Sequence, residues 1–119
     1  MRIGELSRRT KVSERALRYY EQQGLLTAER TAGGHRCFGE AAVARVGCIQ
    51  ELFAAGLCSG KIAQVLPCMP GHGGHGTAPQ ELVDGLRGEL DRLDREIRGL
   101  YRSREVLDTV IREVTRARP

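Results

Sequence analysis

Residues 3–26 read IGELSRRTKVSERALRYYEQQGLL, and this stretch decides the fold of the N-terminal part of the chain. Its first apolar residues mark a short helix that we expect to end near Thr10. Ser13 is a residue type that caps helix N-termini, and Gly24 is one that ends helices, so a second helix is predicted between them. Two short helices joined by a tight connection predict a helix-turn-helix.

The side chains of this second predicted helix divide between two faces. Ala16, Leu17 and Tyr20 share one face by helical spacing, and we expect that face to be buried. The other face carries basic, aromatic and amide residues, which are Arg15, Arg18, Tyr19 and Gln22. In an arbitrary protein a basic helix face is usually only solvated surface. On the second helix of a helix-turn-helix it is typical of contact with DNA.

The positive charge of the chain is concentrated at its N-terminal end. The formal net charge is +4 for the whole chain. Residues 1–38 hold eight Lys or Arg residues against four Glu, whereas residues 39–78 and 79–119 are each balanced. A concentrated basic end on an otherwise balanced chain is what binding to a phosphate backbone requires.

A small hairpin and two further helices are predicted after the helix-turn-helix. Segments 27–31 and 35–38 flank Ala32-Gly33-Gly34, and consecutive glycines tolerate the positive φ of a tight turn, so a two-stranded wing is expected. One helix should then run over 39–56, and a shorter one should begin at Ser59 and stop at the proline in position 67.

A single long helix is predicted from Pro79 onward. Its apolar residues recur at steps that average about 3.5 residues, the repeat of a coiled coil, interrupted at Arg104. At about 1.5 Å per residue this helix forms a rod of roughly 55 Å. The rest of the chain is too small to cover such a stripe, so a second copy is the simplest partner. The residues expected to pack in this homodimer are Leu86, Leu90, Leu93, Ile97, Leu100, Leu107 and Ile111.

These elements predict a mainly α fold with three parts. Residues 1–66 form a winged helix-turn-helix DNA-binding domain with a small β-hairpin wing. Residues 67–78 form a joint rich in Gly, Pro and His, and residues 79–119 form the coiled-coil dimerisation helix. Since this helix runs to the end of the sequence, we expect a short form with no appended effector domain.

Three phrases of the sequence resemble the MerR family of transcription regulators. Residues 3–26 are similar to the family's opening, I-G-E-L-A followed by V-S-x-x-T-L-R-Y-Y-E and G-L-L. GGHRCFGE, at 33–40, stands where the family usually has a G-G-Y-R-x-Y wing. GLCSGKIAQVL, at 56–66, stands where it usually has G-F-S-L-x-x-I. Order and spacing match from residue 1 to residue 66.

The resemblance implies a mode of action on double-stranded DNA. Members of the family are dimers joined by an antiparallel coiled coil, and they bind a pseudo-palindromic operator inside a promoter. They bend and untwist this DNA so that RNA polymerase can read two promoter elements that are spaced too widely. Recognition of this kind also depends on how easily the central base steps deform.

The resemblance also assigns residues to DNA contact. It places Arg15, Arg18 and Tyr19 at the major groove or its flanking phosphates. It implies that Tyr20 braces the helix and contacts a phosphate. Arg36 in the wing and Lys61 at a helix start would touch the backbone. His35 and Phe38 stand where tyrosines are usual, and Phe38 lacks the hydroxyl. The full set is Arg15, Arg18, Tyr19, Tyr20, His35, Arg36 and Lys61.

The joint carries a second candidate site. Family members that sense metals or oxidants place thiols at the start of the dimer helix and in a loop after it. Here Cys68, His72 and His75 precede that helix, and the second cysteine loop is missing. A metal ion held by these three residues, a redox response through Cys68, and a plain flexible joint all remain open, with the plain joint favoured. No other cofactor is expected.

Other classes of protein are weighed against the regulator. No carboxylate pair, nucleophile–histidine arrangement or phosphate-binding loop appears, so an enzyme is not expected. A protein-interaction module and an architectural DNA-binding protein without effector remain alternatives. The charged N-terminus excludes a secretory signal, and the most apolar stretch, 41–58, holds Arg45 and Glu51, so a cytoplasmic protein without membrane contact is expected.

Overall fold

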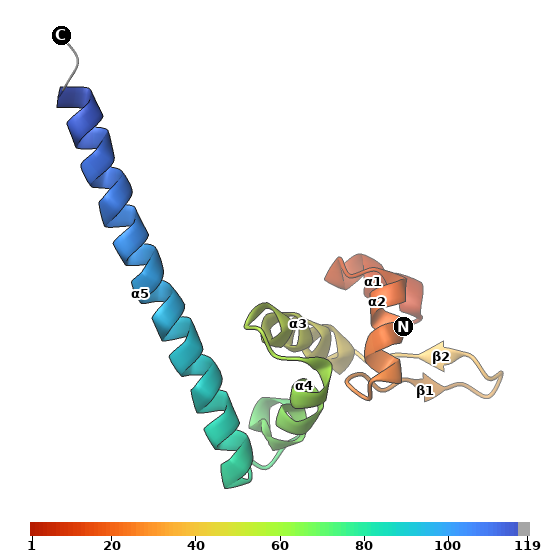
Figure 1. Ribbon diagram of the computed structural model, residues 1–119. Coiled ribbons are helices and arrows are strands. Elements are labelled where there is room, and N and C mark those ends of the chain that lie inside the picture. Colours follow the sequence, from red (N-terminus) through yellow and green to blue (C-terminus); the bar gives the residue numbers. More distant parts are fainter. Residues whose placement is uncertain (117–119) are drawn as a thin grey trace. The chain divides into compact units, whose positions relative to one another are not determined.

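The computed structural model describes residues 1–116 and divides into two units at Ala78 and Pro79. We call residues 1–78 the head and describe it separately from the helix that follows. The head combines a helix-turn-helix, an antiparallel hairpin and two further helices (Figure 1). Its elements are α1 (Ile3–Thr10), α2 (Glu14–Gln22), β1 (Glu29–Arg30), β2 (Arg36–Cys37), α3 (Ala41–Ala54) and α4 (Ser59–Val65).

The tight connection between α1 and α2 forms as predicted. Lys11 adopts the left-handed conformation with φ 61°, and its backbone N–H donates to the carbonyl of Ser7 at 2.9 Å. The Ser13 hydroxyl accepts from the backbone N–H of Ala16 at 3.1 Å, which satisfies one of the free donors at the start of α2. Gly24, with φ +76°, lies just beyond the other end of this helix.

The core of the head is apolar and is closed by its own helices. α1 packs against α2 and α3, and α3 packs against α4. The ring of Tyr20 stacks on that of Phe53 with centroids 5.7 Å apart. The largest fully buried side chains come from all parts of the head, namely Leu6, Leu17, Leu25, Phe38, Val46, Ile49, Ile62 and Leu66.

The predicted wing is present but short. β1 and β2 pair antiparallel, with Glu29 opposite Cys37 and Arg30 opposite Arg36. Gly34 supplies the positive φ of the turn, at +80°, and its N–H donates to the carbonyl of Thr31 at 2.9 Å. The Gly33-Gly34 pair therefore forms the predicted tight turn, and Gly34 is the residue with positive φ.

The joint is more ordered than a plain linker. It contains two 3₁₀ turns, Leu66–Cys68 and Pro70–His72, and clusters with the head. The backbone N–H of Gly76 donates to the carbonyl of Cys68 at 3.0 Å. Gly74 lies so close to the backbone of Pro67 and Met69 that a side chain there would collide with it. The sequence suggested flexibility because its Gly and Pro content cannot reveal such hydrogen bonds across the loop.

The second unit is a single continuous helix, α5 (Gln80–Arg116), 37 residues long (Figure 1). Pairs of opposite charge along it stabilise its surface, such as Arg92 with Glu96 at 2.6 Å and Arg112 with Asp108 at 3.0 Å. The mainly α fold, the winged head and the long C-terminal helix are confirmed. The predicted dimerisation segment extends to 119, and its last three positions lie outside the described residues.

None of the helices in residues 1–116 is long and apolar enough to cross a membrane. This agrees with the charged residues that interrupt the apolar stretch over 41–58.

Candidate nucleic-acid interface

The outer face of α2 carries side chains that are exposed and lightly engaged. Arg15, Arg18 and Tyr19 all lie at the surface. The guanidinium of Arg18 is 3.9 Å from the carboxylate of Glu14 one turn earlier, and both side chains are about half exposed. Such a loose surface pair contributes little to stability. Arg18 can therefore exchange this contact for a phosphate or a base edge at small cost.

A hydrogen-bonded chain connects the exposed face of α2 to the start of α4. The Tyr19 hydroxyl donates to the Ser59 hydroxyl at 3.5 Å, and Ser59 donates to the side-chain oxygen of Gln23 at 3.3 Å. Lys61 follows Ser59 by two residues and is half-buried. The fold therefore brings the first turn of α4 beside α2, as the assignment of Lys61 to the same surface requires.

Tyr20 lies in the core. Its side chain is only 5% exposed, and its hydroxyl accepts a hydrogen bond from the amide of Gln50. Of the two roles predicted for Tyr20, the structure supports bracing of α2, and the phosphate contact is not supported. The reason is helical spacing, since Tyr20 falls with Leu17 on the inward face, as the sequence pattern itself indicated.

The wing adds basic side chains next to α2. Arg36 pairs with Glu21 of α2, Nε to Oε2, at 3.2 Å, and His35 is exposed in the adjoining turn. Arg30 lies directly opposite Arg36 and donates to the carbonyl of Gly34 at 3.1 Å. Sequence analysis did not select Arg30. Counting outward from the three-residue turn Ala32-Gly33-Gly34 would have found it, because residues at equal distance from a hairpin turn share a face.

Not every arginine of the head is available. Arg9 forms an ion pair with Glu40 at 2.8 Å, and this hydrogen bond lowers the pKa of the Glu40 carboxyl below its usual value. Glu40 is therefore ionised at neutral pH, and it neutralises Arg9. Residues 1–12 carry most of the net positive charge of residues 1–38, with four basic residues against Glu5, whereas the charges of α2 cancel and the wing adds +1.

The three candidate metal ligands of the joint are not assembled into a site. Within residues 1–116 the structure gathers no group of three or more His, Cys, Asp or Glu side chains that could hold a metal ion. The Cys68 thiol instead lies 3.6 Å from the carbonyl of Gln64, and Nδ1 of His75 is hydrogen-bonded to the Thr77 hydroxyl at 2.6 Å. The geometry thus gives no support to a metal bound by Cys68, His72 and His75.

The sequence model of the MerR HTH family of regulatory proteins matches residues 1–67, which are the two helices, the wing and the following two helices just described. The chain belongs to this family. The predicted family is confirmed, and so is the prediction of a helix-turn-helix regulatory protein instead of an enzyme.

Curated relatives include a nodulation protein and an HTH-type transcriptional regulator. The chain is 38% identical over 97 residues to the nodulation protein NolA of Bradyrhizobium elkanii, covering 81% of this chain and 40% of that protein. It thus spans about two fifths of the length of this relative. It is 28% identical over 111 residues to the HTH-type transcriptional regulator HmrR of Rhizobium leguminosarum bv. viciae, covering 93% of this chain and 84% of that one.

Solved structures share the fold. A MerR family protein from Listeria monocytogenes is 25% identical, with a TM-score of 0.70 over 93% of this chain and 83% of that chain. HiNmlR, a MerR family regulator lacking the sensor domain and bound to promoter DNA, is 20% identical, with a TM-score of 0.67 over 98% of this chain and 90% of that one. At that identity the second likeness establishes the fold alone.

Proposed function

We propose that this MerR-family chain is a homodimeric transcription regulator that binds a pseudo-palindromic promoter operator and distorts it. The observation that carries this proposal is the exposed basic face of α2, with Arg15, Arg18 and Tyr19, beside the basic wing. In a winged helix-turn-helix, the second helix enters the major groove and the wing lies along the backbone. We assign Arg36, His35 and Lys61 to the backbone, and add Arg30.

The homodimer is inferred from α5. Several large apolar side chains of this helix are half exposed or more, including Leu90 at 55%, Leu100 at 70% and Leu107 at 63%. Contiguous apolar surface of this extent marks an interaction site. A coiled coil with the α5 of a second copy covers such a stripe, and the predicted set from Leu86 to Ile111 follows it.

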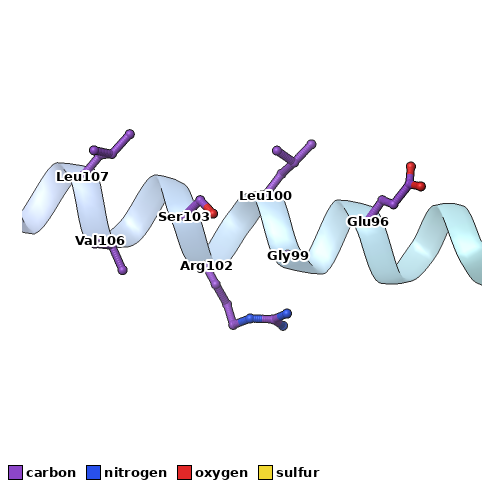
Figure 2. Close-up of a pocket in the computed structure, with 7 residues that line it drawn as sticks. All are labelled: Glu96, Gly99, Leu100, Arg102, Ser103, Val106 and Leu107. Carbon is purple, nitrogen blue, oxygen red and sulfur yellow. The ribbon is translucent and has the colours of Figure 1, made fainter.

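Seven residues of α5 between Glu96 and Leu107 line an open, shallow surface on this helix. Figure 2 shows Leu100 and Leu107 pointing to one side with the small Ser103 between them, while Val106 and Arg102 point to the other. Small residues flanked by large ones form the hole into which a partner's apolar side chain inserts in a coiled coil.

Two joined heads explain the proposed action on DNA. A symmetric dimer presents the same reading surface twice, so its operator repeats with the same symmetry. HiNmlR, which shares the fold, was solved bound to promoter DNA. We include in this proposal that the dimer distorts its operator and thereby gives RNA polymerase access to the promoter. A metal or redox response forms no part of this proposal, and residues 1–116 gather no group of three or more potential metal ligands.

The proposal is tested with the purified chain and a random pool of double-stranded DNA. Repeated selection should enrich an inverted repeat, and affinity for it should fall steeply with salt as phosphate contacts release counterions. Arg18→Ala should weaken binding by about 10- to 100-fold, the range for loss of a base contact. Arg98→Ala, the same change on α5, is the matched control and should bind as the parent does.

Two results would contradict this proposal. Enrichment of no sequence, with uniform coating of every fragment, would favour the architectural alternative. Binding without a salt dependence, or no binding, would favour a protein-interaction module.

A further inference from the structure

Glu21 connects the last turn of α2 to the wing. Its Oε2 lies 3.2 Å from Nε of Arg36, and the Glu21 side chain is only 24% exposed. The recognition helix and the wing strand are therefore joined by a partly buried ion pair. The lower exposure of Glu21 shields this pair from water and salt better than the more exposed carboxylates Glu14 and Glu40 shield theirs.

The geometry of the pair leaves most of the arginine available. The carboxylate contacts Arg36 at Nε, and within residues 1–116 no other carboxylate pairs with this guanidinium. An arginine carries further N–H groups on its two terminal nitrogens. Glu21 thus holds the inner edge of the guanidinium while the outer edge stays free to bind a phosphate. An ion pair of this kind holds the arginine in place without using its terminal N–H groups.

The other oxygen of Glu21 indicates a role beyond stability. Oε1 is buried and has no hydrogen-bond partner in the part of the chain that the structure describes. A buried polar atom without a partner costs free energy, and such costs are expected mainly at functional positions. A smaller or apolar residue at position 21 would stabilise the head equally well.

The wing also requires a negative charge at this point. Arg30 lies directly opposite Arg36, and like charges at opposite positions of a strand pair repel each other. The Glu21 carboxylate, which belongs to α2, offsets the positive charge of one of these two arginines. With Arg36 held in this way, both arginines remain on the same face of the hairpin.

We propose that Glu21 is a positioning residue, which fixes Arg36 so that the wing presents Arg30 and Arg36 together to the DNA backbone. This inference rests on the proposed function, because it needs a DNA ligand. It makes a counterintuitive prediction. Removing a negative charge from a DNA-binding surface ordinarily strengthens binding, whereas removing this one should weaken it.

The test measures affinity for the selected inverted repeat at several salt concentrations. Glu21→Gln keeps the size of the side chain and should weaken binding by about fivefold, the scale of the net contribution of one ordinary hydrogen bond. Glu14→Gln removes the same charge from the exposed first turn of α2 and is the matched control. It should bind as tightly as the parent or more tightly.

A double-mutant cycle separates positioning from a general effect. In an Arg36→Ala background, Glu21→Gln should cause no further loss, since the residue that it orients is gone. Arg36→Ala itself should reduce the salt slope by about one, as expected for one lost phosphate contact. Arg36→Lys keeps the charge but lacks Nε, so it should also weaken binding. Circular dichroism melting checks that each variant is folded.

Unchanged or tighter binding by Glu21→Gln would overturn the inference, and so would a loss that persists in the Arg36→Ala background. In both cases the parent still binds its repeat, so the proposed function stands. Failure of the parent to bind any selected DNA would instead contradict the proposed function itself.

Discussion

Most leucine side chains of the head are buried, whereas several on α5 are exposed. In the head, Leu6 and Leu17 are completely buried, and the core is closed by helices of the same chain. On α5, Leu100 and Leu107 are 70% and 63% exposed. Burial of apolar surface is the dominant favourable contribution to folding and association. The head therefore satisfies this requirement within one chain, whereas we propose that the exposed apolar stripe of α5 satisfies it through a second copy.

This difference assigns a separate task to each region. In the function proposed above, the head reads DNA and α5 joins two heads. A dimer gains affinity because the second head binds at a high effective concentration once the first is bound. Changes in α5 should accordingly reach DNA only through the dimer.

The largest expected effect is loss of the dimer. Leu107→Glu places a charge in the proposed coiled-coil seam, and the cost of burying it should weaken dimerisation by at least about 100-fold. Affinity for an inverted repeat should fall by a similar factor as the second head is lost. Sedimentation equilibrium and gel-shift titration measure the two quantities.

Thr109→Glu is the control for this change, because it introduces the same residue two positions further along the helix. A helix advances about 100° per residue, so position 109 lies on nearly the opposite side of α5. A dimer that survives Leu107→Glu, or that is broken equally by both changes, would contradict the role given to the apolar stripe.

A smaller effect compares one substitution in the two regions. Leu6→Ala should destabilise the head by about 2–5 kcal/mol, because a buried leucine leaves a cavity. Leu100→Ala should change the stability of the head by less than about 0.5 kcal/mol, as expected for an exposed site outside it. Hydrogen exchange of amides in α1 and α3 reports the free energy of opening in each variant. Equal losses in the two variants would mean that the regions are not independent.

The smallest effect concerns cysteines, all four of which lie in the head. Burial raises the pKa of the Cys48 thiol, with a smaller contribution from Glu51. The reactive thiolate of Cys48 therefore forms only at a higher pH than is usual, whereas Cys58 is exposed. At neutral pH a thiol reagent should modify Cys58 faster by roughly tenfold or more. Mass spectrometry of peptides measures both rates.

Denaturant gives the control for the cysteine experiment. In the unfolded chain Cys48 and Cys58 should react at similar rates, and raising the pH should speed the reaction of Cys48 in the folded chain. Rapid modification of Cys48 in the folded chain at neutral pH would contradict the raised pKa of this thiol.

The sequence predicted the elements of the fold well because their signals are local. The Ser13 cap, the Gly24 stop and the apolar repeat of α5 each act over one or two helical turns. The inward face of α2 was also predicted, with Leu17 and Tyr20 buried. The phosphate contact assigned to Tyr20 has no support in the structure, because this residue is only 5% exposed and its hydroxyl accepts a hydrogen bond from Gln50.

What the sequence did not predict depends on contacts between distant residues. The pair of Glu21 with Arg36 spans the wing turn, and the bond from Arg45 to the carbonyl of His72, at 3.3 Å, spans 27 positions. Neither leaves a periodic signal. The order of the joint and the role proposed for Glu21 therefore emerge only from the structure.

The mass of the complex between the chain and its selected inverted repeat tests the central claim most directly. Light scattering after gel filtration gives this mass without assumptions about shape. The account predicts two chains on one duplex, and the same two chains in the absence of DNA. One chain per duplex, at concentrations well above the dissociation constant, would contradict it.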